Sequence, residues 1–382
     1  MNDVNLNFNL AEVTPDQENM FRNLITTGSI FGNGFSEVDK LLMASSAGPF
    51  KSAVTATYYG INNTGYLAAA QRNQDQEGLV FFTRPRMRLS PENCLQHPAL
   101  QNMLVTRGLS PWRAVRAILD PIGSGSPQRI TANRQLKTTQ LYPSDLIDPY
   151  MPFIPLLSNT LTTLTGWPDL DIGHFVSREG IQKETYTLID GVANIYNHFT
   201  LNATFRNIVS DPIGYMFWCW ACYNSQAYQG EATPWMDSIL DNETDYQTRL
   251  YRVVLDSTRT YVQKIAYTGV AVPVVANVGA GFNFNQKPFN EELDDYQVSF
   301  ACDGAVYYDK QAFTTFNRHV QDFNIYMHDG KRQAHMVKLQ PHERKQFKFT
   351  GYPRINPYDS EFELWVFKET YDAMNRRFRG II

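Results

Sequence analysis

Two cysteines three positions apart are the first residues whose spacing could support chemistry. Cys219 and Cys222 have the Cys-x-x-Cys spacing of redox pairs and metal ligands. A thiol gains reactivity at a helix N-terminus, but this pair lies inside an apolar run, several residues after the helix start expected at Pro212. A zinc site would need further ligands, and Cys94 and Cys302 stand alone. We therefore predict a reduced, structural pair and no metal.

Asp169, Asp171 and His174 bring two carboxylates and an imidazole close together in the sequence. An Asp-x-Asp pair can hold a divalent cation, but the spaced acidic residues and glycine of an EF-hand loop are missing. The same groups could serve as acid and base in a hydrolase if they converged in a pocket. A turn with solvated carboxylates is the simpler interpretation.

No familiar catalytic or cofactor signature surrounds the remaining polar residues. Glycines within residues 277–282 resemble part of a dinucleotide fingerprint, but no third glycine or capped helix follows them. The histidines lie outside HExxH, GxSxG and Cys-His patterns, and we expect surface or structural roles for all of them: His97, His174, His198, His319, His328, His335 and His342. The sequence thus predicts a protein that is not an enzyme, with no catalytic, cofactor-binding or metal-binding residues.

Arginine is concentrated in two short segments. The clusters are Arg84, Arg86 and Arg88, and Arg376, Arg377 and Arg379 near the C-terminus. Arginine pairs with carboxylates and phosphates alike, so either cluster could contact an acidic protein surface or DNA. The formal net charge of -4 favours the protein surface.

The residues between 186 and 302 carry the clearest structural pattern. Alternation at 197–207 predicts a half-buried strand, and Ser210-Asp211-Pro212 predicts the capped start of an apolar helix over 213–223. Segments 250–255 and 260–268 flank a turn and predict a hairpin. A strand at 296–302 is expected to close at Asp303-Gly304.

Weaker patterns predict the remaining elements. We expect strands at 51–59, 79–83, 347–349 and 361–367, helices at 15–25 and 91–109, a flexible linker at 120–128 and a turn at 352–357. These elements predict an α+β fold in which β-structure predominates. The predicted regions are an N-terminal arm at 1–50, a small α/β region at 51–125, a Pro-rich connection at 126–180 and a β-rich domain at 181–382.

Composition favours large protein contacts. Only 19% of the 382 residues are charged, while Tyr and Phe number 21 and 24. Aromatic residues are enriched and most charged residues depleted in interface cores, so the chain is expected to bury surface against copies of itself. No secretory signal or membrane span is expected, and four cysteines do not make a disulfide framework in so long a chain. We therefore expect the protein to be synthesised in a cytoplasm.

Several short sequence segments resemble those of virion structural proteins of large tailed bacteriophages with contractile tails. They are LVFFTRPR at 79–86, GWPDL at 166–170, DPIGYMFW at 211–218, YQTRLYR at 246–252 and GFNF at 281–284 with Lys287-Pro288. The nearest resemblance is to subunits of the tail tube and baseplate. It implies a tube-like sheet or barrel built from 197–207, 249–268 and 296–302, with the helix at 213–223 packed on it and an additional N-terminal region.

The resemblance implies a structural virion subunit at the baseplate or tube end. Its expected partners are copies of itself in a ring, with six as the expected number, and neighbouring tube, baseplate or neck proteins. DNA contact is expected only if the subunit lines the channel, and no membrane or cofactor is expected. Alternatives are a neck or collar connector, a tail-associated cell-wall hydrolase using Asp169, Asp171 or His174, and a glycan-binding module with exposed Tyr and Trp.

Overall fold

The computed structural model describes residues 77–105, 110–125, 144, 146–193, 196–241, 243–256, 258–283 and 295–378. The chain divides into two units, Met1–Asp75 and Gln76–Ile382, and every element below belongs to the second. The expected arm at 1–50, helix at 15–25 and strand at 51–59 lie outside the described residues.

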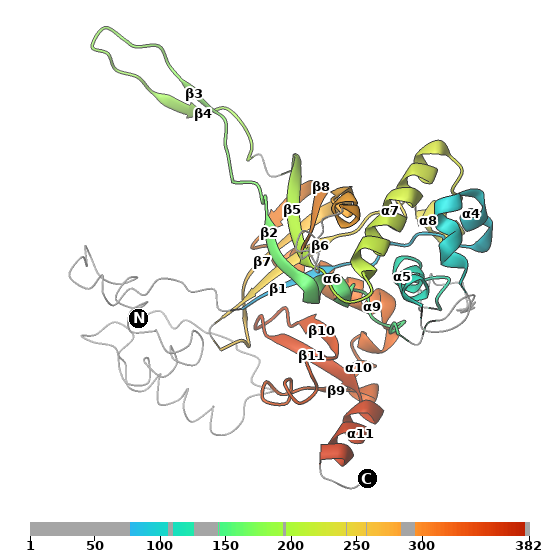
Figure 1. The fold of residues 1–382 in the computed structure, drawn as a ribbon. Helices are drawn as coiled ribbons and strands as arrows, with labels where there is room; N and C mark the ends of the chain where they lie inside the picture. Colours follow the sequence, from blue (N-terminus) through green and yellow to red (C-terminus); the bar gives the residue numbers. More distant parts are fainter. Residues whose placement is uncertain are drawn as a thin grey trace, which may run out of the picture. The chain divides into compact units, whose positions relative to one another are not determined.

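A six-stranded antiparallel sheet forms the centre of the second unit (Figure 1). In spatial order its strands are β1 (Glu77–Phe82), β6 (Leu250–Leu255), β7 (Val262–Ala276), β8 (Asp295–Tyr307), β5 (His198–Arg206) and β2 (Leu161–Thr165). The strand predicted at 197–207 and the hairpin predicted at 250–268 are confirmed. The sheet draws strands from three of the regions expected from sequence, namely 51–125, 126–180 and 181–382.

Alternation along β5 shows why its sequence forms a strand with one buried face. Leu201, Ala203 and Phe205 are buried, while Thr200 and Asn202, which alternate with them along the strand, are exposed. The apolar face joins a core, and the polar face needs no protein partner. The neighbouring β8 was expected to end at Cys302, but it continues to Tyr307, because residues 303 and 305–307 pair with β7. Gly304 accommodates a φ of +67° within the strand.

The helix α7 (Pro212–Gln229) covers one face of this sheet (Figure 1). Pro212 occupies its first turn, and Gly230, with a φ of 75°, ends it. Phe217 makes ring contacts with Phe205 at 5.7 Å and with Phe300 at 6.0 Å between centroids. The predicted helix at 213–223 is confirmed, and its apolar residues pack on the sheet within the subunit.

Short helices complete this side of the sheet. They are α4 (Pro91–Gln96), the 3-10 helix η2 (Pro98–Leu104), α5 (Pro111–Leu119), α6 (Pro155–Thr160) and α8 (Met236–Asp241). The single helix predicted at 91–109 is wrong, because His97 is extended and Pro98 starts a separate 3-10 helix. A new helix, α5, then begins at Pro111.

The flexible linker predicted at 120–128 is also wrong for its described residues. Asp120 is fully buried, and its carboxylate accepts hydrogen bonds from the backbone of Leu89 and Gly123 and from Trp235 Nε1. Ser124 donates to the carbonyl of Pro121 at 3.0 Å. The segment is a packed turn, because these bonds fix a glycine- and serine-rich chain that would otherwise be mobile.

A C-terminal layer covers the other face of the sheet over β1, β6 and β7. Its elements are α9 (Lys310–Phe323), the 3-10 helix η5 (Ile325–Met327), α10 (Arg332–His335), β9 (Met336–Lys338), β10 (Tyr352–Ile355), β11 (Phe362–Phe367) and α11 (Lys368–Phe378). The three strands form a second sheet in the order β10-β11-β9. The strand predicted at 361–367 is confirmed, whereas 347–349 is a turn and 352–355, expected in a turn, is a strand.

Strand β1 separates two cores. Val80 and Phe82 point into the core beneath α7, while Leu79 and Phe81 pack against the core beneath the C-terminal layer. Phe81 lies 5.3 Å from the ring of Phe316 on α9, between centroids. The expected α+β architecture, a strand-rich sheet with a packed helix, is therefore confirmed.

Candidate assembly surface

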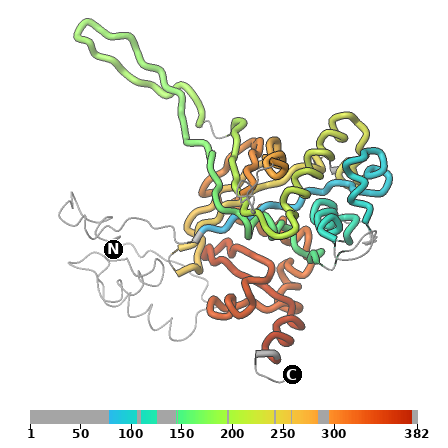
Figure 2. Tube along the Cα trace, in the orientation of Figure 1, coloured from blue at the N-terminus to red at the C-terminus, as the bar shows by residue number. Residues whose placement is uncertain are grey.

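A β-hairpin leaves the central sheet after β2 and extends away from it (Figure 2). Its strands β3 (His174–Val176) and β4 (Thr187–Ile189) pair with each other and with no other strand of the described residues, and every side chain in them is exposed. We call residues 166–193 the hairpin arm. A two-stranded ribbon is marginally stable at best when it stands alone in water.

The base of the hairpin arm is fixed to the sheet. The Trp167 ring lies 6.1 Å from Phe199 and 6.0 Å from Tyr307, between centroids. Tyr307 Oη donates to the carbonyl of Pro168 at 2.7 Å. Gly166 makes the turn with a φ of +106°, where a Cβ atom would lie 2.2 Å from the carbonyl oxygen of Thr200. The hairpin arm therefore leaves the sheet in a defined direction.

Apolar side chains along the hairpin arm remain in solvent. Phe175 and Leu188 face each other across the ribbon and are 49% and 57% exposed, while Ile189 and Val192 are 74% and 88% exposed. Further exposed apolar residues of the hairpin arm are Leu170, Ile172, Val176, Ile181 and Tyr186. Apolar residues grouped in this way mark a protein contact surface.

Asp169, Asp171 and His174 all lie in the hairpin arm. Their side chains are exposed along an extended segment, which agrees with the interpretation of solvated carboxylates. No group of three or more potential ligands capable of holding a metal ion occurs within the described residues. The geometry gives no support to the hydrolase alternative, because acid–base catalysis requires the groups to converge around a substrate.

The Cys-x-x-Cys pair lies in the core beneath α7. Cys219, Cys222, Cys94 and Cys302 are all free and buried, and all four belong to the same core. Burial raises the pKa of the Cys94 thiol to about 11 and that of Cys302 to about 12. The pKa of Cys219 is raised further, by burial and then by its neighbours Cys222 and Cys94. The predicted structural role agrees with this, because the reactive thiolate forms are disfavoured.

The first arginine cluster is folded into the subunit. Arg84 is 3% exposed and donates to the carbonyls of Ala117, Ile118 and Met151. Arg86 pairs with Glu243 at 3.1 Å. In the same way Arg88 pairs with Glu92 at 2.8 Å and its guanidinium lies 5.2 Å from the Trp235 ring centre. The expected external contact is therefore wrong for Arg84, while Arg376 of the second cluster is exposed on α11.

Among the histidines expected to have surface or structural roles, His319 has an unusual environment. His319 on α9 has a buried Nε2 atom without a hydrogen-bond partner. Burial, and then the positive charges of Arg86 and Arg249, lower its pKa to about 3. No local sequence signal indicates this environment, because the two arginines come from segments more than 50 residues away. His198, in contrast, is exposed and lies 3.1 Å from Asp303 across β5 and β8.

Three features are typical of a structural protein that contacts other proteins. They are the sheet with its packed helix, the buried thiols and the exposed apolar hairpin arm. No described helix combines the length and apolar character needed to cross a membrane. The family model described as "Putative phage tail tube protein" matches residues 30–378. The chain belongs to this phage tail tube family and is a structural subunit of the phage tail, as its sequence phrases predicted. Membership in a family of structural proteins also agrees with the prediction that it is not an enzyme.

Solved structures of contractile injection systems show a distant likeness. The tube-terminating cap of the anti-feeding prophage is 10% identical, with 41% of this chain and 81% of that chain covered and a TM-score of 0.25. The PVC sheath/tube terminator is 9% identical, with 41% of this chain and 87% of that chain covered and a TM-score of 0.23. A chain of the PVC sheath-tube complex is 10% identical, with 41% of this chain and 82% of that chain covered and a TM-score of 0.23. At these scores the likeness carries no argument about function. No curated protein sequence matches the chain.

Proposed function

We propose that this tail subunit assembles with copies of itself into a ring and that the hairpin arm makes the contact with a neighbouring copy. The exposed apolar side chains of the hairpin arm carry this proposal. A neighbouring copy is the partner that fits, since a tail tube protein repeats the same surface around its ring. Burying the residues of the hairpin arm would stabilise the assembly by about 25 cal/mol for each Å² of apolar surface removed from water.

The ring would contain six subunits and contact neighbouring tube, baseplate or neck proteins. A position at the baseplate or the tube end is proposed, with a neck or collar connector as the other position. The subunit would be synthesised in the host cytoplasm before it joins the virion. Residues 181–382 would supply most of the ring-building part, completed by β1 and β2 from the preceding regions.

The polar face of β5 and β8 is the proposed channel-facing surface. Thr200 and Asn202 are exposed there, and Ser299 donates to the Asn202 amide oxygen at 2.7 Å. The C-terminal layer does not cover this part of the sheet, and its polar side chains remain hydrated without a protein partner. DNA passing through the channel would meet this surface of mostly uncharged groups.

The test is the oligomeric state of the full chain with Ile189→Asp and Val192→Asp combined. Both side chains are exposed in the subunit, so the double variant is expected to keep its thermal stability as a monomer while losing rings. The matched control is Thr187→Asp, an exposed polar position on the same strand. Native mass spectrometry and electron micrographs that show the same rings for wild type and double variant would overturn the assignment of the hairpin arm. A wild-type chain that remains a monomer and is absent from virions would overturn the ring itself.

A further inference from the structure

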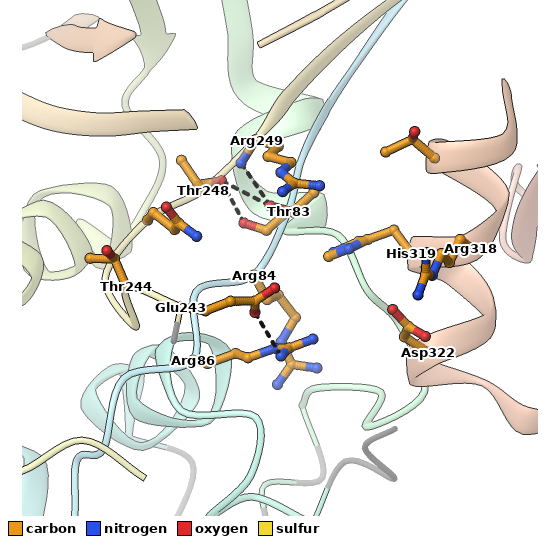
Figure 3. A pocket seen from close by; sticks show the side chains of 12 residues that line it. Thr83, Arg84, Arg86, Glu243, Thr244, Thr248, Arg249, Arg318, His319 and Asp322 are labelled. Carbon is orange, nitrogen blue, oxygen red and sulfur yellow. Dashed lines mark hydrogen bonds and ion pairs between the residues drawn. The ribbon is translucent and has the colours of Figure 1, made fainter. Parts of the chain in front are cut away.

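A polar cavity of about 360 Å³ lies between α9, the end of β1 and the segment that leads into β6 (Figure 3). His319, Arg318 and Asp322 enter it from α9, opposite Thr83, Thr248 and Arg249. Arg84, Arg86 and Glu243 contribute to its wall. Residues far apart in the sequence therefore converge on one site, which neither the hairpin arm nor the proposed channel surface uses.

Positive charge exceeds negative charge around this cavity. Its lining holds four arginines and two carboxylates: Arg84, Arg86, Arg249, Arg318, Glu243 and Asp322. An arginine side chain remains charged in a protein, so the lining carries a surplus of positive charge at neutral pH. Charge inside a concave, partly dehydrated wall concentrates the field on a bound counter-ion.

Two of the arginines at the cavity, Arg249 and Arg86, are held in fixed positions. Arg249 donates from Nε to the carbonyl of Gly269 at 2.9 Å, and Arg86 is held by Glu243. Each guanidinium carries five N–H donors, so these bonds leave donors for a further acceptor. Arg318 has no hydrogen-bond or ion-pair partner within the described part of the chain. Fixed donors bind an anion with a smaller loss of side-chain entropy than mobile ones.

His319 supplies a second, independent observation. Its Nε2 atom is buried at the cavity wall without a hydrogen-bond partner, which is uncommon for a buried polar group. An oxygen acceptor in the cavity would accept a hydrogen bond from the ring nitrogen that carries the proton. Among the described residues that line the cavity there is no aromatic ring besides this imidazole, so they offer no stacking platform of the kind that a nucleobase would use.

We propose that this cavity binds a compact oxyanion, a phosphate or a carboxylate group, held by Arg86, Arg249 and Arg318 with His319 as a hydrogen-bond donor. Guanidinium groups match both anions geometrically through paired N–H donors. Thr244 and Gln247 add neutral hydrogen-bonding groups at the cavity. The site is separate from the surfaces proposed for ring assembly, so it can be tested whether or not the ring proposal holds.

The experiment measures thermal unfolding of the full chain in titrations of inorganic phosphate and, separately, of citrate at constant ionic strength set with sodium chloride. A saturable rise in Tm is expected, because an anion that binds only the folded state stabilises it. The Arg318→Gln variant is expected to weaken binding about tenfold, the effect of losing a charged hydrogen bond. Arg206→Gln removes an exposed arginine outside the cavity and should bind as wild type does.

The two titrations distinguish the anions. Saturation by phosphate alone would identify a phosphate site, saturation by citrate alone a carboxylate site, and saturation by both a general oxyanion site. A Tm that depends only on ionic strength, or an Arg318→Gln variant with unchanged affinity, would overturn the proposal. NMR gives a second readout. The His319 imidazole signal is assigned by its loss in the His319→Gln variant. A bound anion should shift that signal and raise the His319 pKa from about 3.

Discussion

Tyr296 on β8 donates a hydrogen bond from its hydroxyl to the Asp211 carboxylate at 2.6 Å. The bond ties the start of α7 to the sheet that the helix covers. The segment Ser210-Asp211-Pro212 was expected to supply a side-chain cap, but Asp211 at the N-cap position adopts a left-handed conformation with a φ of 52° and makes no side-chain cap. Its carboxylate holds the sheet instead, which fixes the entry of the chain into α7.

Replacing Tyr296 by Phe is expected to destabilise the subunit by about 1.5–3 kcal/mol, because a hydrogen bond to a charged acceptor is lost. Burial, and then the hydrogen bond to Asp211, raise the Tyr296 pKa well above its usual range. Urea unfolding measures the change, with Tyr308→Phe as the control at an exposed tyrosine. Equal stability of the two variants would show that the Tyr296 bond contributes nothing.

A second prediction concerns Glu363, which is buried in the C-terminal sheet. It accepts hydrogen bonds from Arg354 and from Trp365 Nε1, both at 2.8 Å, and lies 3.2 Å from Lys338. Glu363→Gln is expected to cost about 2–4 kcal/mol in urea unfolding, because the partly buried Arg354 and Lys338 lose a buried carboxylate. Glu361→Gln is the control, since Glu361 contacts Lys338 from a more exposed position. A Glu363→Gln variant as stable as the control would contradict this role.

The same residue predicts acid sensitivity. Burial opposes ionisation of Glu363, but the hydrogen bonds from Trp365 and Arg354 and the nearby cations outweigh it and lower its pKa. The stabilisation is complete above the pKa of the unfolded chain, about 4.5, and is lost as the pH falls through the lower pKa of the folded state. Wild type should therefore lose more stability than Glu363→Gln as the pH falls below about 4.5, as Tm measurements across this range would reveal.

His319 predicts a pH effect in a higher window. The folded pKa of about 3 lies below the ordinary value of 6.5, so the unfolded chain binds a proton more readily. Stability is therefore complete above pH 6.5 and falls as the pH drops toward 3, by at most about 1.4 kcal/mol per pH unit for one proton. His319→Gln should flatten this part of the profile, whereas His342→Gln, at an exposed position, should leave it unchanged. Parallel profiles for wild type and His319→Gln would contradict the assignment.

The buried thiols are expected to react only after unfolding. All four cysteines are buried and their pKa values are raised, so a thiol reagent at pH 8 should modify the native chain slowly and modify four thiols once urea is added. Rapid modification of native Cys219 or Cys222 would revive the redox interpretation of the Cys-x-x-Cys pair.

Local pattern predicted the elements that depend on near neighbours. The alternation around Leu201 and Phe205 predicted β5, and Pro212 with the apolar residues after it predicted α7, because the periods of strand and helix can be read over a few residues. The same local signals failed where long-range bonds decide the conformation. Asp120 appears in a linker-like sequence, yet its three hydrogen bonds make the segment a buried turn.

The sequence by itself determined the class of protein. Its short characteristic segments and balanced charge indicated a tail structural subunit without catalytic chemistry. Its periodicity indicated a sheet with a packed helix. Tertiary structure alone decided that Arg84 is buried and that Arg86, Arg249 and His319 meet at one cavity. It also decided that the hairpin arm carries its apolar residues into solvent. The physical reason is that periodicity reports which face of an element is apolar, whereas burial and charge pairing depend on which distant elements cover that face.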